Sequence, residues 1–86
     1  MEERIIDCSQ IHSKEDLHRI FRENLSFPDW YGNNLDALYD CLTELSGKVR
    51  LLEWDSAENR LGEYGKKAKK VIVNAALRNT DLDLYI

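Results

Sequence analysis

A segment near the middle of the chain, Leu25 to Thr43, reads LSFPDWYGNNLDALYDCLT. Pro28 interrupts the helical pattern that precedes it, because a proline disfavours the helical conformation at the residue before it. The turn residues Gly32, Asn33 and Asn34 follow, and either asparagine can cap a new helix. Leucines then recur at helical spacing, so the segment predicts a loop followed by an amphipathic helix over 34–45.

The regions on both sides of this segment alternate between strand and helix patterns. Ser13 is a capping residue ahead of the first helix, and Gly47 is predicted to end the central helix as a C-cap. Strands that alternate with helices favour a parallel sheet, so the order predicts an α/β fold with a three-stranded parallel sheet packed with about four helices. The expected strands cover 4–8, 49–54 and 82–86, the expected helices cover 14–25, 34–45, 55 or 56 to 60, and 66–78, and a loop covers 62–65.

Length and composition place further bounds on the protein. The chain has 86 residues, which at roughly 100–200 residues per domain predicts a single domain over 1–86. Its apolar runs fall short of the roughly 20 residues that cross a bilayer, and its N-terminus lacks the basic and apolar regions of a secretion signal. Two cysteines, Cys8 and Cys41, are too few for a disulfide scaffold and lack metal-ligand spacing. We therefore expect a cytoplasmic protein with no metal, no cofactor and no membrane partner.

The helix expected at 34–45 carries an acidic stripe, which consists of Asp36, Asp40 and Glu44 at positions i, i+4 and i+8. Like charges at this spacing oppose each other by roughly 0.2–0.5 kcal/mol per pair, and no Lys, Arg or His occurs between Asn24 and Gly47. Such locally unfavourable choices are typical of functional sites. Two interpretations stay open on spacing alone: a site for a cationic partner, or a solvated face balanced by bases from elsewhere in the fold.

Aromatic side chains lie close to the acidic stripe in the sequence. Trp30 and Tyr31 precede the helix, and Tyr39 precedes Asp40. Trp and Tyr are enriched at the energetic centres of protein interfaces, so aromatics around carboxylates predict a surface that fits a cleft lined with Arg, Lys or His. Tyr31 and Trp54 are predicted to close the hydrophobic core.

The remaining titratable groups do not predict catalysis. Asp36 and Asp40 on an exposed stripe lack the sheltered pocket that separates the pKa values of a catalytic carboxylate pair. His12 and His18 have no nucleophile at a recognisable spacing, and we expect His18 to be partly exposed. Cys41 adjoins the apolar side of its helix and is predicted to be a buried small hydrophobe.

A basic cluster opens a later helix and consists of Lys66, Lys67, Lys69 and Lys70. It lacks interleaved aromatics, its charges oppose the dipole at a helix N-terminus, and it belongs to a chain of formal net charge −4. The cluster therefore predicts a solvated face, with nucleic-acid binding as the alternative.

The segment from Leu25 to Thr43 resembles the signature of the barstar family, whose members are intracellular inhibitors of barnase-type ribonucleases. The family pattern is a Leu, a turn with Pro, an aromatic pair and Gly, then Asn-Leu-Asp-Ala-Leu, an aromatic and Asp-Cys-Leu-Thr. Two further stretches are similar to the family, SKEDLH at 13–18 and Leu-Glu-Trp at 52–54. The resemblance covers nearly the whole chain in order and spacing, and it is strongest from Leu25 to Trp54.

This resemblance implies a barstar-like fold and a non-catalytic inhibitor that binds one to one. In the family, the second helix and the loop before it plug the active site of the ribonuclease. That cleft is cationic because it binds a polyanion, and charge complementarity speeds such encounters, for which the family's own enzyme–inhibitor pair is a standard example. Carried over to this chain, Asp36 is the first acidic contact and Asp40 occupies the enzyme's phosphate site. The other predicted partner-binding residues are Trp30, Asn34, Leu35, Tyr39 and Glu44.

The chain departs from the best-known family pattern at several positions. Glu44 and Leu45 stand where that pattern has Gly-Trp, and Tyr39 replaces a Trp. Ala75 lies at or near the position of an acidic contact in the later helix, and Cys8 is extra. These departures leave one alternative open, a barstar-like binding or immunity module, as in a toxin–antitoxin pair, for a different cationic protein.

Overall fold

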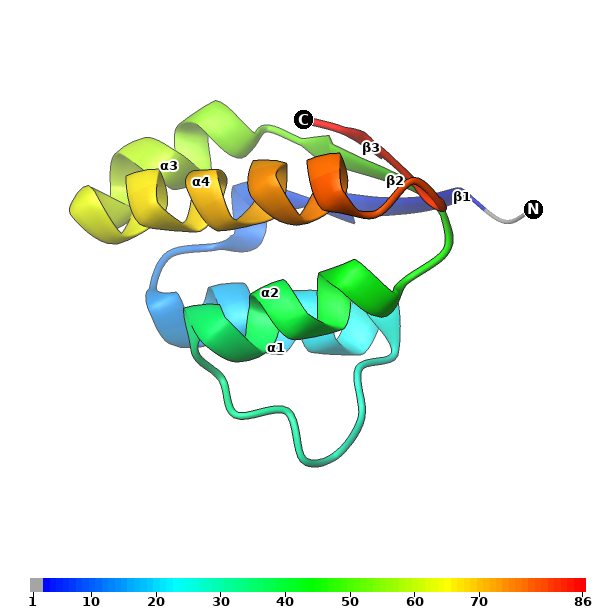
Figure 1. Ribbon diagram of the computed structural model, residues 1–86. Helices are drawn as coiled ribbons and strands as arrows, with labels where there is room; N and C mark the ends of the chain where they lie inside the picture. Colours follow the sequence, from blue (N-terminus) through cyan, green and yellow to red (C-terminus); the bar gives the residue numbers. More distant parts are fainter. Residues whose placement is uncertain (1–2) are drawn as a thin grey trace.

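Strands and helices alternate along the chain in the order that the sequence predicts (Figure 1). The structure is a computed structural model that describes residues 3–86, so the first two residues of the predicted domain lie outside it. Its elements are β1 (Glu3–Asp7), the 3-10 helix η1 (Cys8–Gln10), α1 (Lys14–Leu25), α2 (Leu35–Glu44), β2 (Gly47–Leu52), α3 (Trp54–Leu61), α4 (Glu63–Arg78) and β3 (Leu82–Tyr85).

The three strands form one parallel sheet in the order β1-β2-β3. Adjacent parallel strands need long crossover connections; α1 and α2 provide the first, and α3 and α4 the second. In the central strand, Val49 pairs with Arg4 on one side and with Leu84 on the other. This arrangement confirms the predicted α/β fold with a three-stranded parallel sheet and four helices.

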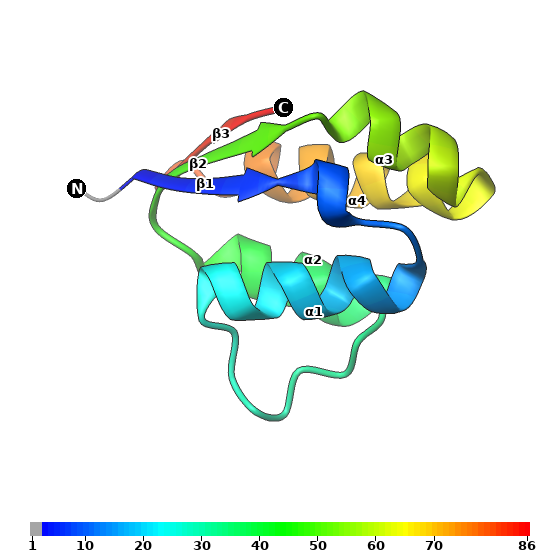
Figure 2. The same cartoon turned by 180° about the vertical axis from the view of Figure 1, so that it is seen from behind.

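Alternation along the strands gives the sheet one buried face and one exposed face. Inward-facing residues such as Ile6 and Leu51 are buried against the helices, whereas Ile5, Leu52 and Tyr85 are exposed on the outer face. Both α1 and α2 lie on the same side of the sheet (Figures 1 and 2), and α4 packs against α2 and α3. None of the helices within residues 3–86 is long and apolar enough to cross a membrane.

Local side-chain hydrogen bonds begin the two helices that precede β2. The Oγ of Ser13 accepts a hydrogen bond from the backbone N–H of Asp16 at 3.1 Å, as expected of an N-cap. Leu25 ends α1, and Ser26 follows in the left-handed conformation with φ 56°. The chain then passes through the loop at 26–34 before α2 begins.

The predicted end of the central helix is wrong. Glu44 is the last residue of α2, and Gly47, with φ 108°, is the first residue of β2 rather than a helix cap. The next strand is also displaced, because β2 ends at Leu52 and Trp54 already belongs to α3. Glu53 makes the turn between them at φ 60°. Trp54 is buried, as predicted.

The loop predicted at 62–65 is not present. The junction between α3 and α4 is the single residue Gly62, and α4 starts at Glu63. Gly65 lies inside α4, where an added Cβ would stand 2.5 Å from the backbone oxygen of Glu58 in α3. Gly65 therefore marks a close contact between two helices and not a turn.

Candidate functional site

The loop at 26–34 and helix α2 carry all seven of the predicted partner-binding residues, which we call the candidate surface. Asn34 caps α2, because its side-chain oxygen accepts a hydrogen bond from the backbone N–H of Ala37 at 2.8 Å. Asn33 precedes it at φ 56°, a conformation that Asn tolerates better than most residues. The cap therefore fixes where the helix starts and which side chains its outer face presents. The candidate surface consists of Trp30, Asn34, Leu35, Asp36, Tyr39, Asp40 and Glu44.

The acidic stripe lies on the exposed side of α2. Asp36, Asp40 and Glu44 are all exposed, and an α-helical rise of about 1.5 Å per residue separates neighbours by about 6 Å along the axis. Within residues 3–86, ion pairs join Arg19 to Asp16 and Arg50 to Glu3, and none reaches the stripe. The bases that a solvated face would need for balance are thus not supplied at contact distance by the described part of the fold.

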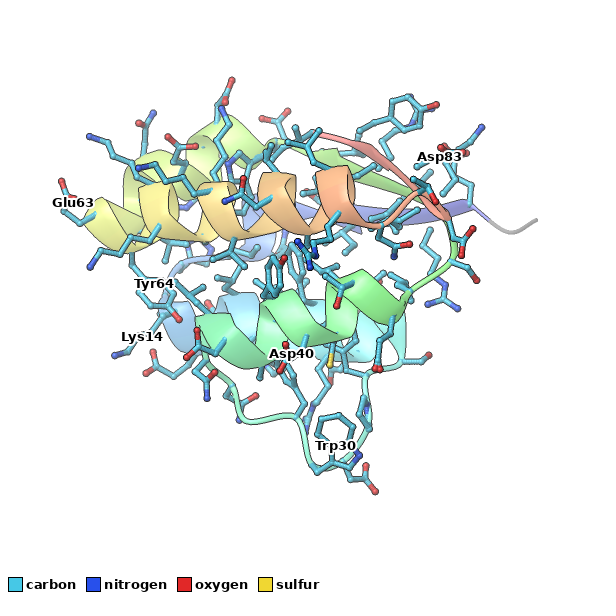
Figure 3. All side chains as sticks on the ribbon, in the orientation of Figure 1. Lys14, Trp30, Asp40, Glu63, Tyr64 and Asp83 are labelled. Carbon is cyan, nitrogen blue, oxygen red and sulfur yellow. The ribbon has the colours of Figure 1, made fainter. Side chains whose placement is uncertain are left out.

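Trp30 lies at the end of the loop that is farthest from the sheet, and Asp40 lies on α2 (Figure 3). The Trp30 side chain is 73% exposed, although indole rings normally bury much of their surface. A shallow groove of about 150 Å³ brings Trp30 together with Glu44 and Leu45 at the C-terminal end of α2. Asn34 and Leu35 line a different cleft at the N-terminal end of the helix. Tyr39 is partly buried and packs against the core.

Two groups that sequence reasoning did not assign to the site hold it in place. His18 was predicted to be partly exposed, and this is wrong: it is 2% exposed. Its Nδ1 lies 2.6 Å from the hydroxyl of Tyr31, and its Nε2 lies 2.6 Å from the hydroxyl of Tyr64. Tyr31 is buried as predicted, and its ring also contacts that of Phe27 with 4.9 Å between centroids. The loop is thereby connected to α1 and α4.

The second group is the side chain of Asn79, which follows α4 and is buried. Its amide donates hydrogen bonds to the carbonyl oxygens of Leu42 at 2.9 Å and Leu45 at 2.6 Å. These carbonyls lie at the C-terminal end of α2, where the last backbone oxygens lack a partner four residues on; the Leu42 oxygen also accepts from the Leu45 N–H at 3.4 Å. A single Asn between an expected helix and an expected strand gave no sequence signal for this long-range cap.

The remaining predicted groups lie away from the site or are inert. Cys8 and Cys41 are both buried and unpaired, and burial raises the pKa of the Cys8 thiol to about 12, which suppresses thiolate formation. Residues 3–86 contain no cluster of three or more His, Cys, Asp or Glu side chains that could hold a metal ion. The basic cluster is exposed on α4, and none of its lysines pairs with a carboxylate among the described residues: Lys66, Lys67, Lys69 and Lys70.

Two comparisons with known proteins show what the chain as a whole is similar to. Residues 1–84 match the family described as Barstar (barnase inhibitor). The chain is also 38% identical over 78 residues to the Bacillus subtilis (strain 168) protein named "Putative ribonuclease inhibitor YrdF", and this match covers 87% of this chain and 86% of the relative. A family match over almost the whole length, together with a relative of the same size and a fold of the predicted topology, identifies the family: the chain belongs to the barstar family.

Proposed function

We propose that this protein is a cytoplasmic inhibitor that binds one barnase-type ribonuclease and blocks its active site with the candidate surface. Asp40 occupies the position of an RNA phosphate, Asp36 and Glu44 extend the negative charge along the helix, and Trp30 and Tyr39 supply apolar contact. The observation that carries this proposal is the acidic stripe, which is exposed and has no counter-ion within residues 3–86.

The charge of a ribonuclease cleft is determined by the RNA that it must bind. Its cleft is cationic because its substrate is a polyanion, and a row of carboxylates presents it with charges of the same sign. Complementary charge speeds the encounter and excludes wrong partners. In the free protein the carboxylates of the stripe on α2 repel one another. In a complex, the basic side chains of a cationic cleft attract the same carboxylates.

The rigidity of the candidate surface also supports the proposal. Asp40 lies in the middle of a capped helix, and the Oγ of Thr43 donates a hydrogen bond to the Asp40 carbonyl at 2.8 Å. The same helix is held at its far end by the side chain of Asn79. A backbone segment that is already fixed loses little conformational entropy on binding, which favours tight complexes.

The experiment is a titration of a barnase-type ribonuclease with the wild-type protein, Asp40→Ala and Asp83→Ala, with residual RNA cleavage as the readout. Asp83 is also an exposed aspartate, but it lies on β3, well away from Asp40 (Figure 3). We expect wild type and Asp83→Ala to abolish activity at a one-to-one ratio. We expect Asp40→Ala to bind at least about 30-fold more weakly, which corresponds to the roughly 2 kcal/mol that defines an interface hot spot.

Two results would count against the proposal. A folded wild-type protein that leaves the ribonuclease fully active would exclude this enzyme class and favour the alternative of a different cationic protein partner. Equal loss of inhibition in Asp40→Ala and Asp83→Ala would mean that the acidic stripe is not the contact. Circular dichroism on each variant establishes that it is folded, which we expect because an exposed surface substitution changes stability by about 0.5 kcal/mol or less.

A further inference from the structure

The side chain of His18 connects three separate segments of the protein through two short hydrogen bonds. His18 belongs to α1, Tyr31 to the loop at 26–34, and Tyr64 to the first turn of α4; both oxygen–nitrogen distances are 2.6 Å. Within residues 3–86, the bond between Tyr31 and His18 is the one side-chain hydrogen bond that ties residues 27–33 to another element. Trp30, the most exposed aromatic of the candidate surface, is the neighbour of Tyr31 in the chain.

The burial of the two tyrosines determines which nitrogen of His18 carries the proton. A neutral imidazole offers one donor and one acceptor. The hydroxyl of Tyr31 is buried and has no acceptor other than His18 among the described residues, so it must donate to Nδ1. Nε2 therefore bears the hydrogen and donates to the oxygen of Tyr64. The opposite tautomer would leave the hydroxyl proton of Tyr31 buried and unpaired, which is unfavourable.

Tyr64 can accept this bond because its own proton has access to solvent. Its side chain is only partly buried and lines an open cleft of about 460 Å³ between α1 and the start of α2. Lys14 lies over the Tyr64 ring, with its Nζ 5.9 Å from the centroid, and both residues are at the same end of the molecule (Figure 3). All hydrogen-bonding groups of the three side chains are thus satisfied in one arrangement only.

We infer that neutral His18, protonated on Nε2, is a positioning residue that holds Tyr31 and with it the Trp30 loop in the binding-competent arrangement, and that a second proton on His18 releases this loop. When Nδ1 also becomes a donor, it can no longer accept from Tyr31, and the buried hydroxyl proton of Tyr31 loses its acceptor. The tyrosine must then rotate or leave its site. The effect on binding rests on the proposed function, whereas the effect on the loop does not.

The charges around His18 set the direction of this response. Burial lowers the pKa of His18 from its ordinary value of 6.5; the nearby carboxylate of Glu15 raises it and the ammonium of Lys14 lowers it. The other charged side chains that line the cleft are Arg19 and Arg22 of α1. Tyr31 and Tyr64 face the imidazole from the loop and α4, and burial raises the pKa of both phenols, so they stay neutral. From α2, the Cys41 thiol acts electrostatically on Tyr31, and burial raises the pKa of this thiol as well.

The sign of the pH effect follows from linkage. Because the pKa of His18 is lower in the folded state than in the unfolded state, the unfolded state binds more protons as the pH falls below 6.5. The contribution of neutral His18 is complete above pH 6.5 and is lost as the pH falls through the folded-state pKa. Loop order and affinity should decline over the same interval.

The primary test is nuclear magnetic resonance on the free protein, so it does not depend on any ribonuclease. The nitrogen shifts of His18 at pH 7.5 should report a proton on Nε2 and none on Nδ1. The protection factor of the Tyr31 amide, which donates to the Pro28 carbonyl at 3.0 Å, should fall with the same midpoint as the His18 titration once it is corrected for intrinsic exchange. A proton on Nδ1 at pH 7.5, or loop protection that ignores the His18 midpoint, would overturn the inference.

Variants extend this test and its link to binding. His18→Gln keeps a donor and an acceptor but does not titrate, so its loop protection should be flat from pH 7.5 down through the His18 midpoint measured in the wild type. If that variant does not fold, Tyr31→Phe serves instead: it removes the hydroxyl that donates to Nδ1, so it should lower loop protection at pH 7.5 and abolish the change at the His18 midpoint. Tyr85→Phe, on the exposed outer face, should do neither. Where a ribonuclease binds, the affinity of the wild type should fall about 5-fold or more relative to that of His18→Gln over this interval. Equal pH profiles of affinity in the two proteins would contradict the coupling between His18 and binding. If no ribonuclease binds, that result would contradict only the proposed function.

Discussion

The side-chain amide of Asn79 lies 2.6 Å from the carbonyl oxygen of Leu45, 34 positions earlier in the chain. It also reaches the carbonyl of Leu42, so one buried side chain satisfies two oxygens at the end of α2. The helix that bears the acidic stripe is therefore fixed at its start by its own Asn34 and at its end by Asn79, which follows α4. Stability and the geometry of the candidate surface depend on the same contact.

Asn79→Ala should destabilise the protein by about 1–3 kcal/mol, because the Leu45 carbonyl oxygen loses its partner and the Leu42 oxygen keeps only the Leu45 N–H at 3.4 Å. The measurement is denaturant unfolding of the variant beside Asn74→Ala, which removes an exposed Asn from α4, the helix that Asn79 follows. The Asn74 variant should change the free energy of unfolding by about 0.5 kcal/mol or less. Similar losses in both variants would show that the long-range cap contributes little.

Gly65→Ala should lower stability by about 1–3 kcal/mol, the usual result of forcing extra atoms into packed space. The direction is informative because Gly→Ala inside a helix is ordinarily stabilising by about 1 kcal/mol. At Gly65 the new Cβ would meet the backbone of Glu58, which cannot move aside like a flexible side chain. Thermal or urea unfolding measures the change, and a variant more stable than wild type would refute the close helix contact.

Trp30 should report complex formation directly. It is 73% exposed in the free protein, whereas the other tryptophan, Trp54, is 3% exposed. Burial of Trp30 in a ribonuclease cleft should shift its emission to shorter wavelength, and Trp30→Phe should lose that shift while it keeps its free energy of unfolding. A ribonuclease without tryptophan, or one with its tryptophans replaced, gives the cleanest signal. An unchanged spectrum at saturating ribonuclease would place Trp30 outside the interface.

Salt should slow association more than it speeds dissociation. Between about 0.1 and 1 M salt the screening length falls from about 10 to about 3 Å, so attraction between the acidic stripe and a cationic cleft weakens at a distance. Stopped-flow association rates should fall steeply for wild type and less steeply for Asp40→Ala. Asp83→Ala, which removes a charge on the sheet, should keep nearly the wild-type slope. Identical slopes in wild type and Asp40→Ala would contradict steering by the stripe.

The local pattern of the sequence was sufficient to predict the helices that carry the candidate surface. Ser13 and Asn34 cap α1 and α2 through hydrogen bonds to residues three positions away, and such contacts follow from the order of neighbouring residues. The alternation of strands and helices was likewise enough for the parallel sheet. The candidate surface was predicted from one helix and its loop because its residues are contiguous in the chain.

The errors arose where partners are distant in sequence. Gly47 looked like a helix C-cap, but the cap is the side chain of Asn79, and Gly65 looked like a loop residue although its role is a close contact with Glu58. His18 was expected to be partly exposed because an isolated polar residue on a helix usually is. Its burial depends on two hydroxyls, one of which lies 46 positions away. Tertiary hydrogen bonds of this kind leave no periodic signal in a single sequence.

The most direct measurement for the proposed mechanism is a map of the backbone amide signals that change when a catalytically inactive barnase-type ribonuclease is added to the labelled protein. The account predicts that the largest changes fall within 30–44, on Trp30 and the exposed side of α2, at a one-to-one ratio. Changes concentrated on the basic cluster of α4, or on the exposed outer face of the sheet around Arg50 and Tyr85, would contradict it.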